Sequence, residues 1–120
     1  MITLYGIPNC DTVKRSRAWL VERSLSHTFH DFKTKGVPPE ALDLWIERLG
    51  WEPLVNKKGT TWRKLDPATQ ASIVDAKSAR ALMLREPSVI KRPVVVLQDS
   101  GAPRLTVGYA PDAWASWPKS

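Results

Sequence analysis

The alternation of apolar and polar residues predicts a strand, a helix and a second strand in the first third of the chain. The run Ile2-Thr3-Leu4-Tyr5 is β-prone and is closed by Gly6-Ile7-Pro8-Asn9, a cluster typical of a loop. Helical spacing follows from Asp11 to about Ser24, and His27 to Phe32 alternates enough for a second strand. Cys10 therefore lies where a loop meets a helix N-terminus.

Helices are predicted for the middle of the chain. The clearest pattern is an i, i+3, i+4, i+7 stripe that Gly50 ends, and its members are Leu42, Trp45, Ile46 and Leu49. The segment from Asn56 to Lys64 is polar and basic and is compatible with a short helical turn. Asp66-Pro67 is typical of a helix start, and Asp75 to Arg85 predicts a further helix that Pro87 follows.

The last third of the chain predicts two strands and a short helix. The apolar run Val94 to Leu97 is typical of a buried strand, Asp99 to Gly101 is a turn, and Arg104 to Val107 is a hairpin partner. A short helix is predicted from Pro111 to Trp117.

This order of elements predicts an α/β fold with a small mixed sheet. A helical crossover between the first two strands implies a parallel pair, and the short turn near the end implies an antiparallel pair. The outline is that of a thioredoxin-like fold with a helical insertion, about residues 38–88, between the second and third strands. We expect residues 1–120 to form a single domain.

Composition then narrows the class of protein. With 42% hydrophobic and 25% charged residues, the chain resembles neither a disordered nor a membrane protein, and no stretch approaches the roughly 18 apolar residues of a membrane-spanning helix. We expect no secretory signal and a cytoplasmic location. The formal net charge of +6 favours an anionic partner, which includes nucleic acid, an acidic protein surface or a small anion.

The single cysteine limits the available chemistry. One thiol excludes an intramolecular disulfide, and a thioredoxin-type pair is absent because Val13 stands three positions after Cys10. A phosphatase-type loop is absent as well, because Ser16 stands where that loop has arginine. Any catalytic cycle through Cys10 therefore needs an outside thiol, for which glutathione is the obvious donor.

A helix N-terminus favours thiolate over thiol at Cys10, because the helix dipole and unpaired backbone amides stabilise negative charge there. Lys14, Arg15 and Arg17 add positive charge nearby. The alternative, a buried cysteine that acts only as a small hydrophobe, stays open. His27 and His30 are three residues apart on a predicted strand and point to opposite faces, so we expect no metal site.

Three blocks of sequence together resemble the ArsC/Spx family of bacterial proteins, most closely its YffB-like branch. The blocks are Tyr5 to Lys14, Asn56 to Leu65 and Ile90 to Pro93. The resemblance implies a thioredoxin-like fold and a reductase that is resolved by glutathione, with glutaredoxin as a further partner in arsenate reductases. It implies no bound cofactor, and glutathione would be a co-substrate.

The resemblance also implies the site residues. The nucleophile would be Cys10, and Arg92 is the one family arginine that carries over to the anion site. Apart from the resemblance, the further candidates for anion binding are Asn56, Lys57, Lys58, Arg63 and Lys14. A cis proline would position glutathione together with two residues of the cysteine loop, and this set is Pro93, Asn9 and Thr12.

Two of the three arginines that hold arsenate in this family have no counterpart in the chain. Arg92 matches one, Asn56 occupies the position of another, and the third falls near Val107-Gly108. Each lost charge-assisted contact would cost about 1.5 to 3 kcal/mol, which argues against efficient arsenate reduction.

A glutathione-dependent thiol or oxyanion reductase is therefore the first hypothesis for function. The second is a regulator resembling Spx, which binds RNA polymerase without catalysis, although Val13 removes the CxxC switch that many Spx proteins carry. Nucleic-acid binding is not favoured, because the basic residues are dispersed and no recognition motif is present.

Overall fold

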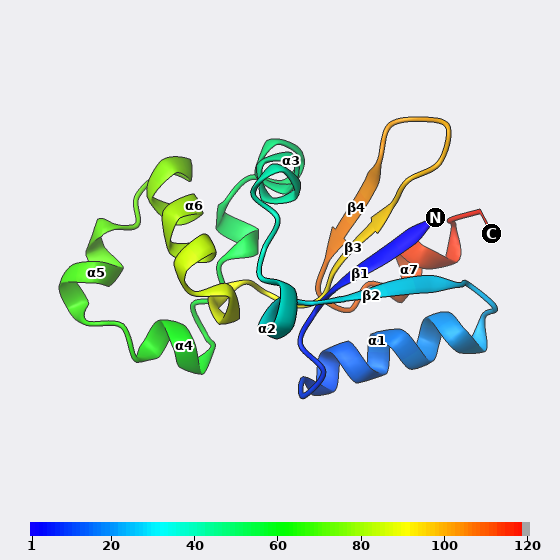
Figure 1. Ribbon diagram of the computed structural model, residues 1–120, viewed down its shortest axis with the longest axis horizontal. Coiled ribbons are helices and arrows are strands. Elements are labelled where there is room, and N and C mark those ends of the chain that lie inside the picture. Colours follow the sequence, from blue (N-terminus) through cyan, green and yellow to red (C-terminus); the bar gives the residue numbers. More distant parts are fainter. Residues whose placement is uncertain (119–120) are drawn as a thin grey trace. The chain divides into compact units, whose positions relative to one another are not determined.

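The computed structural model describes residues 1–118, and the chain divides into two compact units. The first, which we call the sheet unit, comprises residues 1–35 and the chain from Arg92 onward. Its elements are β1 (Ile2–Gly6), α1 (Asp11–Glu22), β2 (His27–Asp31), α2 (Phe32–Lys35), β3 (Val94–Leu97), β4 (Arg104–Val107) and α7 (Pro111–Ala115) (Figure 1). The second, the helical unit, comprises Gly36–Lys91.

The sheet unit has a mixed four-stranded sheet in the order β2-β1-β3-β4. β1 pairs in parallel with β2, as the helical crossover predicts, and antiparallel with β3. β3 and β4 form the predicted antiparallel hairpin, with Val94 opposite Val107. The α/β class and the mixed sheet predicted from the sequence are thus confirmed.

The core of the sheet unit lies between one face of the sheet and the helices α1 and α7. Alternate residues of β1 and β3 face it, together with the apolar stripe of α1 and two tryptophans at the end of the chain. Its buried members are Ile2, Leu4, Val13, Leu20, Leu25, Val95, Leu97, Trp114 and Trp117. Trp114 is fully buried, and its indole N–H donates to Thr106 Oγ1 at 2.8 Å, so its polar atom is satisfied.

The helical unit lies between β2 and β3 in the sequence. It contains the four helices α3 (Pro39–Leu49), α4 (Thr60–Arg63), α5 (Pro67–Ser72) and α6 (Ala76–Arg85), with short 3₁₀ turns η1 (Glu52–Leu54) and η2 (Pro87–Val89). Gly50 ends α3 at φ +80°, as the pattern predicts, and Trp45 of the same helix is fully buried. α3 and α6 are joined at the surface by Asp43 and Arg80, whose Oδ1 and Nε are 2.6 Å apart.

Several boundaries differ from the sequence prediction: β1 includes Gly6, and α1 ends at Glu22, not near Ser24. β2 stops at Asp31, not Phe32, because the Asp31 side chain accepts a hydrogen bond from the Lys33 amide at 2.8 Å and begins α2. The last helix ends at Ala115, not Trp117. Within residues 1–118, no helix is long and apolar enough to cross a membrane.

Candidate active site

Cys10 occupies the N-cap position of α1. Its backbone is extended, with φ −106° and ψ 124°, and its carbonyl accepts the first helical hydrogen bond from the Lys14 amide at 2.9 Å. The neutral thiol makes no side-chain cap hydrogen bond, although serine, threonine and aspartate at this position ordinarily do. The first turn of α1 therefore keeps its backbone N–H groups available to a stronger acceptor.

Gly6 permits the close approach of α1 to the end of β1. A Cβ built on Gly6 would lie 2.7 Å from Cγ2 of Val13, which is fully buried and, as a β-branched residue, has little rotameric freedom. The absence of a side chain at Gly6 thus allows Val13 to fit under the strand and places its amide beside the Cys10 sulfur.

The Cys10 pKa is lowered from its ordinary value by a balance of opposing effects. Partial burial of the sulfur raises the pKa, and this largest single effect is outweighed by four stabilising ones together. These are the backbone N–H of Val13, a hydrogen bond from Arg92, the positive charge of Arg92 and the backbone N–H of Thr12. The arrangement favours the thiolate, which is the nucleophilic form of cysteine.

Arg92 reaches the sulfur from the loop that precedes β3. The Arg92–Pro93 peptide bond is cis, the isomer that the family resemblance implies, and Pro93 is buried. The Pro93 carbonyl accepts a hydrogen bond from the Gly108 amide at 2.8 Å. This contact ties the Arg92 loop to the end of β4.

The remaining predicted residues of the sheet unit lie in or beside the first turn of α1. Thr12 is half-buried, and its carbonyl accepts a hydrogen bond from the buried Ser16 hydroxyl at 2.7 Å. Asn9 and Lys14 are exposed on either side of Cys10 in the sequence. The structure thus brings Cys10, Thr12 and Arg92 together, while the roles predicted for Asn9, Lys14 and Pro93 stay predictions.

The other predicted anion-binding residues belong to the helical unit. Asn56 Oδ1 accepts a hydrogen bond from the Lys58 amide at 3.2 Å, which shapes the turn before α4. The Lys57 ammonium lies over two indole rings, 5.9 Å from the centroid of Trp51 and 5.4 Å from that of Trp62. Lys58 and Arg63 are exposed, and the role of this group at the sulfur stays a prediction.

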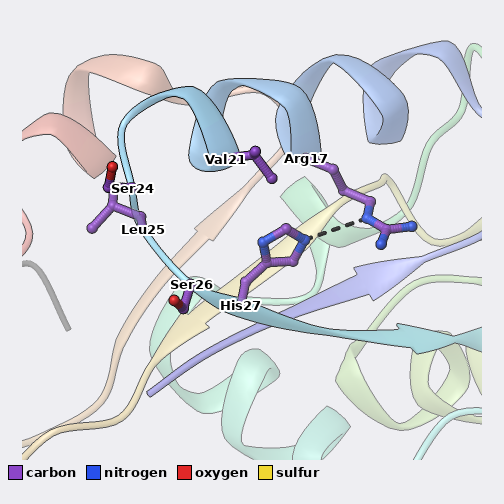
Figure 2. Close-up of a pocket in the computed structure, with 6 residues that line it drawn as sticks. All are labelled: Arg17, Val21, Ser24, Leu25, Ser26 and His27. Atoms are coloured by element: carbon purple, nitrogen blue, oxygen red, sulfur yellow. Dashed lines mark hydrogen bonds between the residues drawn. The ribbon is translucent and has the colours of Figure 1, made fainter.

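A cavity of about 490 Å³ lies away from Cys10, toward the C-terminal end of α1. It is lined by Arg17, Val21, Ser24, Leu25, Ser26 and His27 (Figure 2). The Nε of Arg17 donates to His27 Nε2 at 3.3 Å, and the Arg17 guanidinium also lies 4.4 Å from the centroid of the Phe29 ring. The cavity is not part of the thiol site, because Cys10 and the residues of the first turn of α1 do not line it.

The sequence indicates positive charge from Arg15 near Cys10, but it does not predict the contact of Arg15 with the loop after β4. Gly108 adopts φ +84°, which favours glycine, and Tyr109 follows it. The guanidinium of Arg15 lies 4.0 Å from the centroid of the Tyr109 ring. A glycine after a predicted strand was the available signal for the turn, but the pairing of residues 15 and 109 has no local signature.

Comparison with known proteins places this geometry in context. A model of the ArsC family matches residues 5–117. The solved structure of a protein named YffB superposes with a TM-score of 0.86 at 44% identity and covers 97% of both chains. An arsenate reductase related protein from Brucella melitensis has a TM-score of 0.71 at 44% identity, over 97% of this chain and 92% of that one.

A more distant relative is named as a transcriptional regulator. The global transcriptional regulator Spx of Streptococcus pyogenes is 27% identical over 115 residues, which cover 93% of this chain and 81% of Spx. The fold is therefore thioredoxin-like, and the relatives include both reductase-related proteins and a transcriptional regulator.

Proposed function

Since the chain belongs to the ArsC family, we propose that it is a glutathione-dependent thiol reductase with Cys10 as its only nucleophile. The observation that carries the proposal is the surroundings of the Cys10 sulfur, where two backbone amides and the Arg92 guanidinium favour the thiolate. A stabilised thiolate at a partly exposed helix N-terminus is typical of reactive cysteines.

The proposed reaction has two exchange steps. The Cys10 thiolate attacks the glutathione sulfur of a mixed disulfide, so that a Cys10–glutathione disulfide forms, the original S–S bond breaks and the other thiolate leaves to take up a proton. A glutathione thiolate then attacks the glutathione sulfur of this adduct, which releases oxidised glutathione and regenerates the Cys10 thiolate. The net result is that the substrate thiol is released. Two glutathione molecules, one of which arrived with the substrate, leave as oxidised glutathione.

Arsenate is a poorer substrate in this proposal. Arg92 supplies one of the three guanidinium groups expected around arsenate, and Asn56 supplies none. Arginine at position 108 would be strained, because the backbone there has φ +84°. A compact multiply charged oxyanion would therefore be held by too few charge-assisted contacts, whereas a disulfide needs mainly the thiolate.

The decisive experiment compares the wild-type protein with Cys10→Ser on the mixed disulfide of glutathione and 2-mercaptoethanol. Release of oxidised glutathione is followed in the presence of excess glutathione. The wild type should turn over, and Cys10→Ser should not exceed the uncatalysed rate, because a serine hydroxyl is not ionised at neutral pH. Far-ultraviolet circular dichroism establishes that the variant is folded, and equal turnover by the two proteins would reject the proposal.

The similarity to Spx supports a second candidate, a regulator that binds RNA polymerase. The aligned region covers 93% of this chain. A thiol switch of the CxxC type is absent, because the position of its second cysteine is occupied by Val13, which is fully buried beneath Gly6. Capture of the C-terminal domain of the polymerase α subunit by the purified protein would support this candidate, and it would do so most clearly if Cys10→Ser binds equally well.

A further inference from the structure

Arg15 is connected to the thiol site through a series of contacts. From the Cys10 sulfur the contacts pass to Arg92, and the Pro93 that follows it is bonded to Gly108 at 2.8 Å. Tyr109 comes next in the chain, and its ring lies under the Arg15 guanidinium at 4.0 Å. The loop after β4 therefore connects the Arg92 loop to the first turns of α1.

Tyr109 is itself fixed in place. Its ring packs edge-on against Trp114, with the centroids 5.7 Å apart and an interplanar angle of 86°, and Trp114 is fully buried. A guanidinium stacked on such a ring loses little further rotameric freedom when it binds a ligand. Within residues 1–118, Arg15 is exposed and forms no ion pair, so its charge is available to an anion.

We propose that Arg15, stacked on Tyr109, binds the glycyl carboxylate of the glutathione moiety that becomes attached to Cys10. This inference rests on the proposed function and specifies which part of the glutathionylated substrate the protein recognises. The γ-glutamyl end of glutathione carries an ammonium beside its carboxylate and is locally neutral. The glycyl carboxylate has no such partner and is the group that a free guanidinium fork fits best.

The distances that the chain allows are compatible with this contact. Five residues of α-helix between positions 10 and 15 rise about 7.5 Å along the axis and leave the two positions about 140° apart around it, a separation that two long, flexible groups have to span. Three extended residues span about 10 Å, and the cysteine of glutathione lies in the middle of its chain. With the glutathione sulfur fixed to Cys10, its glycyl end and the long Arg15 side chain can therefore meet.

The test compares two substrates, the mixed disulfides of 2-mercaptoethanol with glutathione and with glutathione glycyl ethyl ester. Arg15→Gln should raise KM for the glutathione substrate by about fivefold, the effect of losing one exposed ion pair, and leave kcat unchanged. The KM for the ester should be the same in wild type and variant. Arg15→Lys, which keeps the charge but loses the fork, should restore part of the affinity.

Arg17→Gln is the matched control. It removes the same charge from the same helix and also unstacks an arginine from an aromatic ring, but that ring is Phe29 on β2. Its KM for both substrates should equal that of the wild type. An Arg15→Gln variant with unchanged KM for the glutathione substrate, or with an equal change for the ester, would overturn the inference. Failure of the wild type to turn over either substrate would instead reject the proposed function.

Discussion

The helices α1 and α6 both begin after an extended residue, but the side chains of these two residues act differently. In both, the residue before the helix is extended, with φ −106° at Cys10 and −152° at Asp75. At α6, Asp75 Oδ1 accepts from the Ser78 amide at 2.8 Å, and Ser78 Oγ accepts from the Asp75 amide at 3.1 Å, so both side chains satisfy backbone donors. At α1 no side-chain cap hydrogen bond is made.

This difference shows what a cysteine at an N-cap position contributes. Asp75 is a permanent cap at neutral pH, because the Ser78 amide, followed by the Ser78 hydroxyl, lowers the pKa of its carboxyl group. Cys10 becomes a good acceptor only when it ionises, so the amides of Thr12 and Val13 stabilise the reactive state in particular. The start of α1 therefore lacks a side-chain cap while the thiol is neutral, and its backbone amides stabilise the reactive thiolate instead.

Among the variants that test the contrast between the two helix starts, Gly6→Ala should have the largest effect on stability and turnover. The new Cβ would lie 2.7 Å from Val13 Cγ2 and displace the start of α1, and overpacking of this kind costs about 1 to 3 kcal/mol. Thermal unfolding should begin at lower temperature, and turnover should fall because the Val13 amide moves away from the sulfur.

The matched control for Gly6 is Gly101→Ala. A Cβ at Gly101 would be 3.6 Å from Asp99 Oδ1, an ordinary contact, so stability and turnover should both match the wild type. If Gly6→Ala behaved like Gly101→Ala, the close fit of β1 to α1 would not position the amides.

Asp75→Ala tests the permanent cap. Loss of the side-chain acceptor should cost about 1 kcal/mol in the free energy of unfolding, measured by urea denaturation. Asp75→Asn should stay within a few tenths of a kcal/mol of the wild type, because asparagine is an equally good N-cap. Turnover should be unchanged in both variants. An Asp75→Ala variant as stable as the wild type would mean that the capping box does not stabilise α6.

The sequence predicts the elements around the thiol better than the contacts between them. Ile2 to Tyr5, Gly50 and Val94 to Leu97 carry strong local signals, because hydrophobic periodicity and glycine punctuation act over a few residues. The placement of Cys10 at a helix start follows from the same signals. These predictions hold in the structure within a residue or two.

Contacts between distant residues could not be predicted in the same way. The stacking of Arg15 on Tyr109 and the hydrogen bond from Gly108 to Pro93 depend on how β4 returns beside β3. Nothing in either local segment encodes them. The proximity of Arg92 to Cys10 was available only from the family resemblance, since the two residues are brought together by the pairing of β1 with β3.

The smallest expected effect is a pH-dependent difference in stability between the wild type and Cys10→Ala. The Cys10 pKa is lowered in the folded protein, whereas an unperturbed thiol has a pKa of about 8.5. As pH rises through the folded pKa, the unfolded state binds more protons, so the wild type gains stability relative to the variant. The gain is complete above the unfolded pKa and is lost as pH falls through the folded one.

Urea midpoints under reducing conditions, measured between about pH 5 and about pH 9.5, would detect this change. The difference between wild type and Cys10→Ala should widen toward high pH, and it should stay modest because the thiol is only half-buried and solvent screens its charge. The corresponding difference for Asp75→Ala should be constant over the same range, since that carboxylate stays ionised. A constant difference for Cys10→Ala would mean that the thiolate does not cap α1, and the contrast between the two helix starts would then be one of sequence alone.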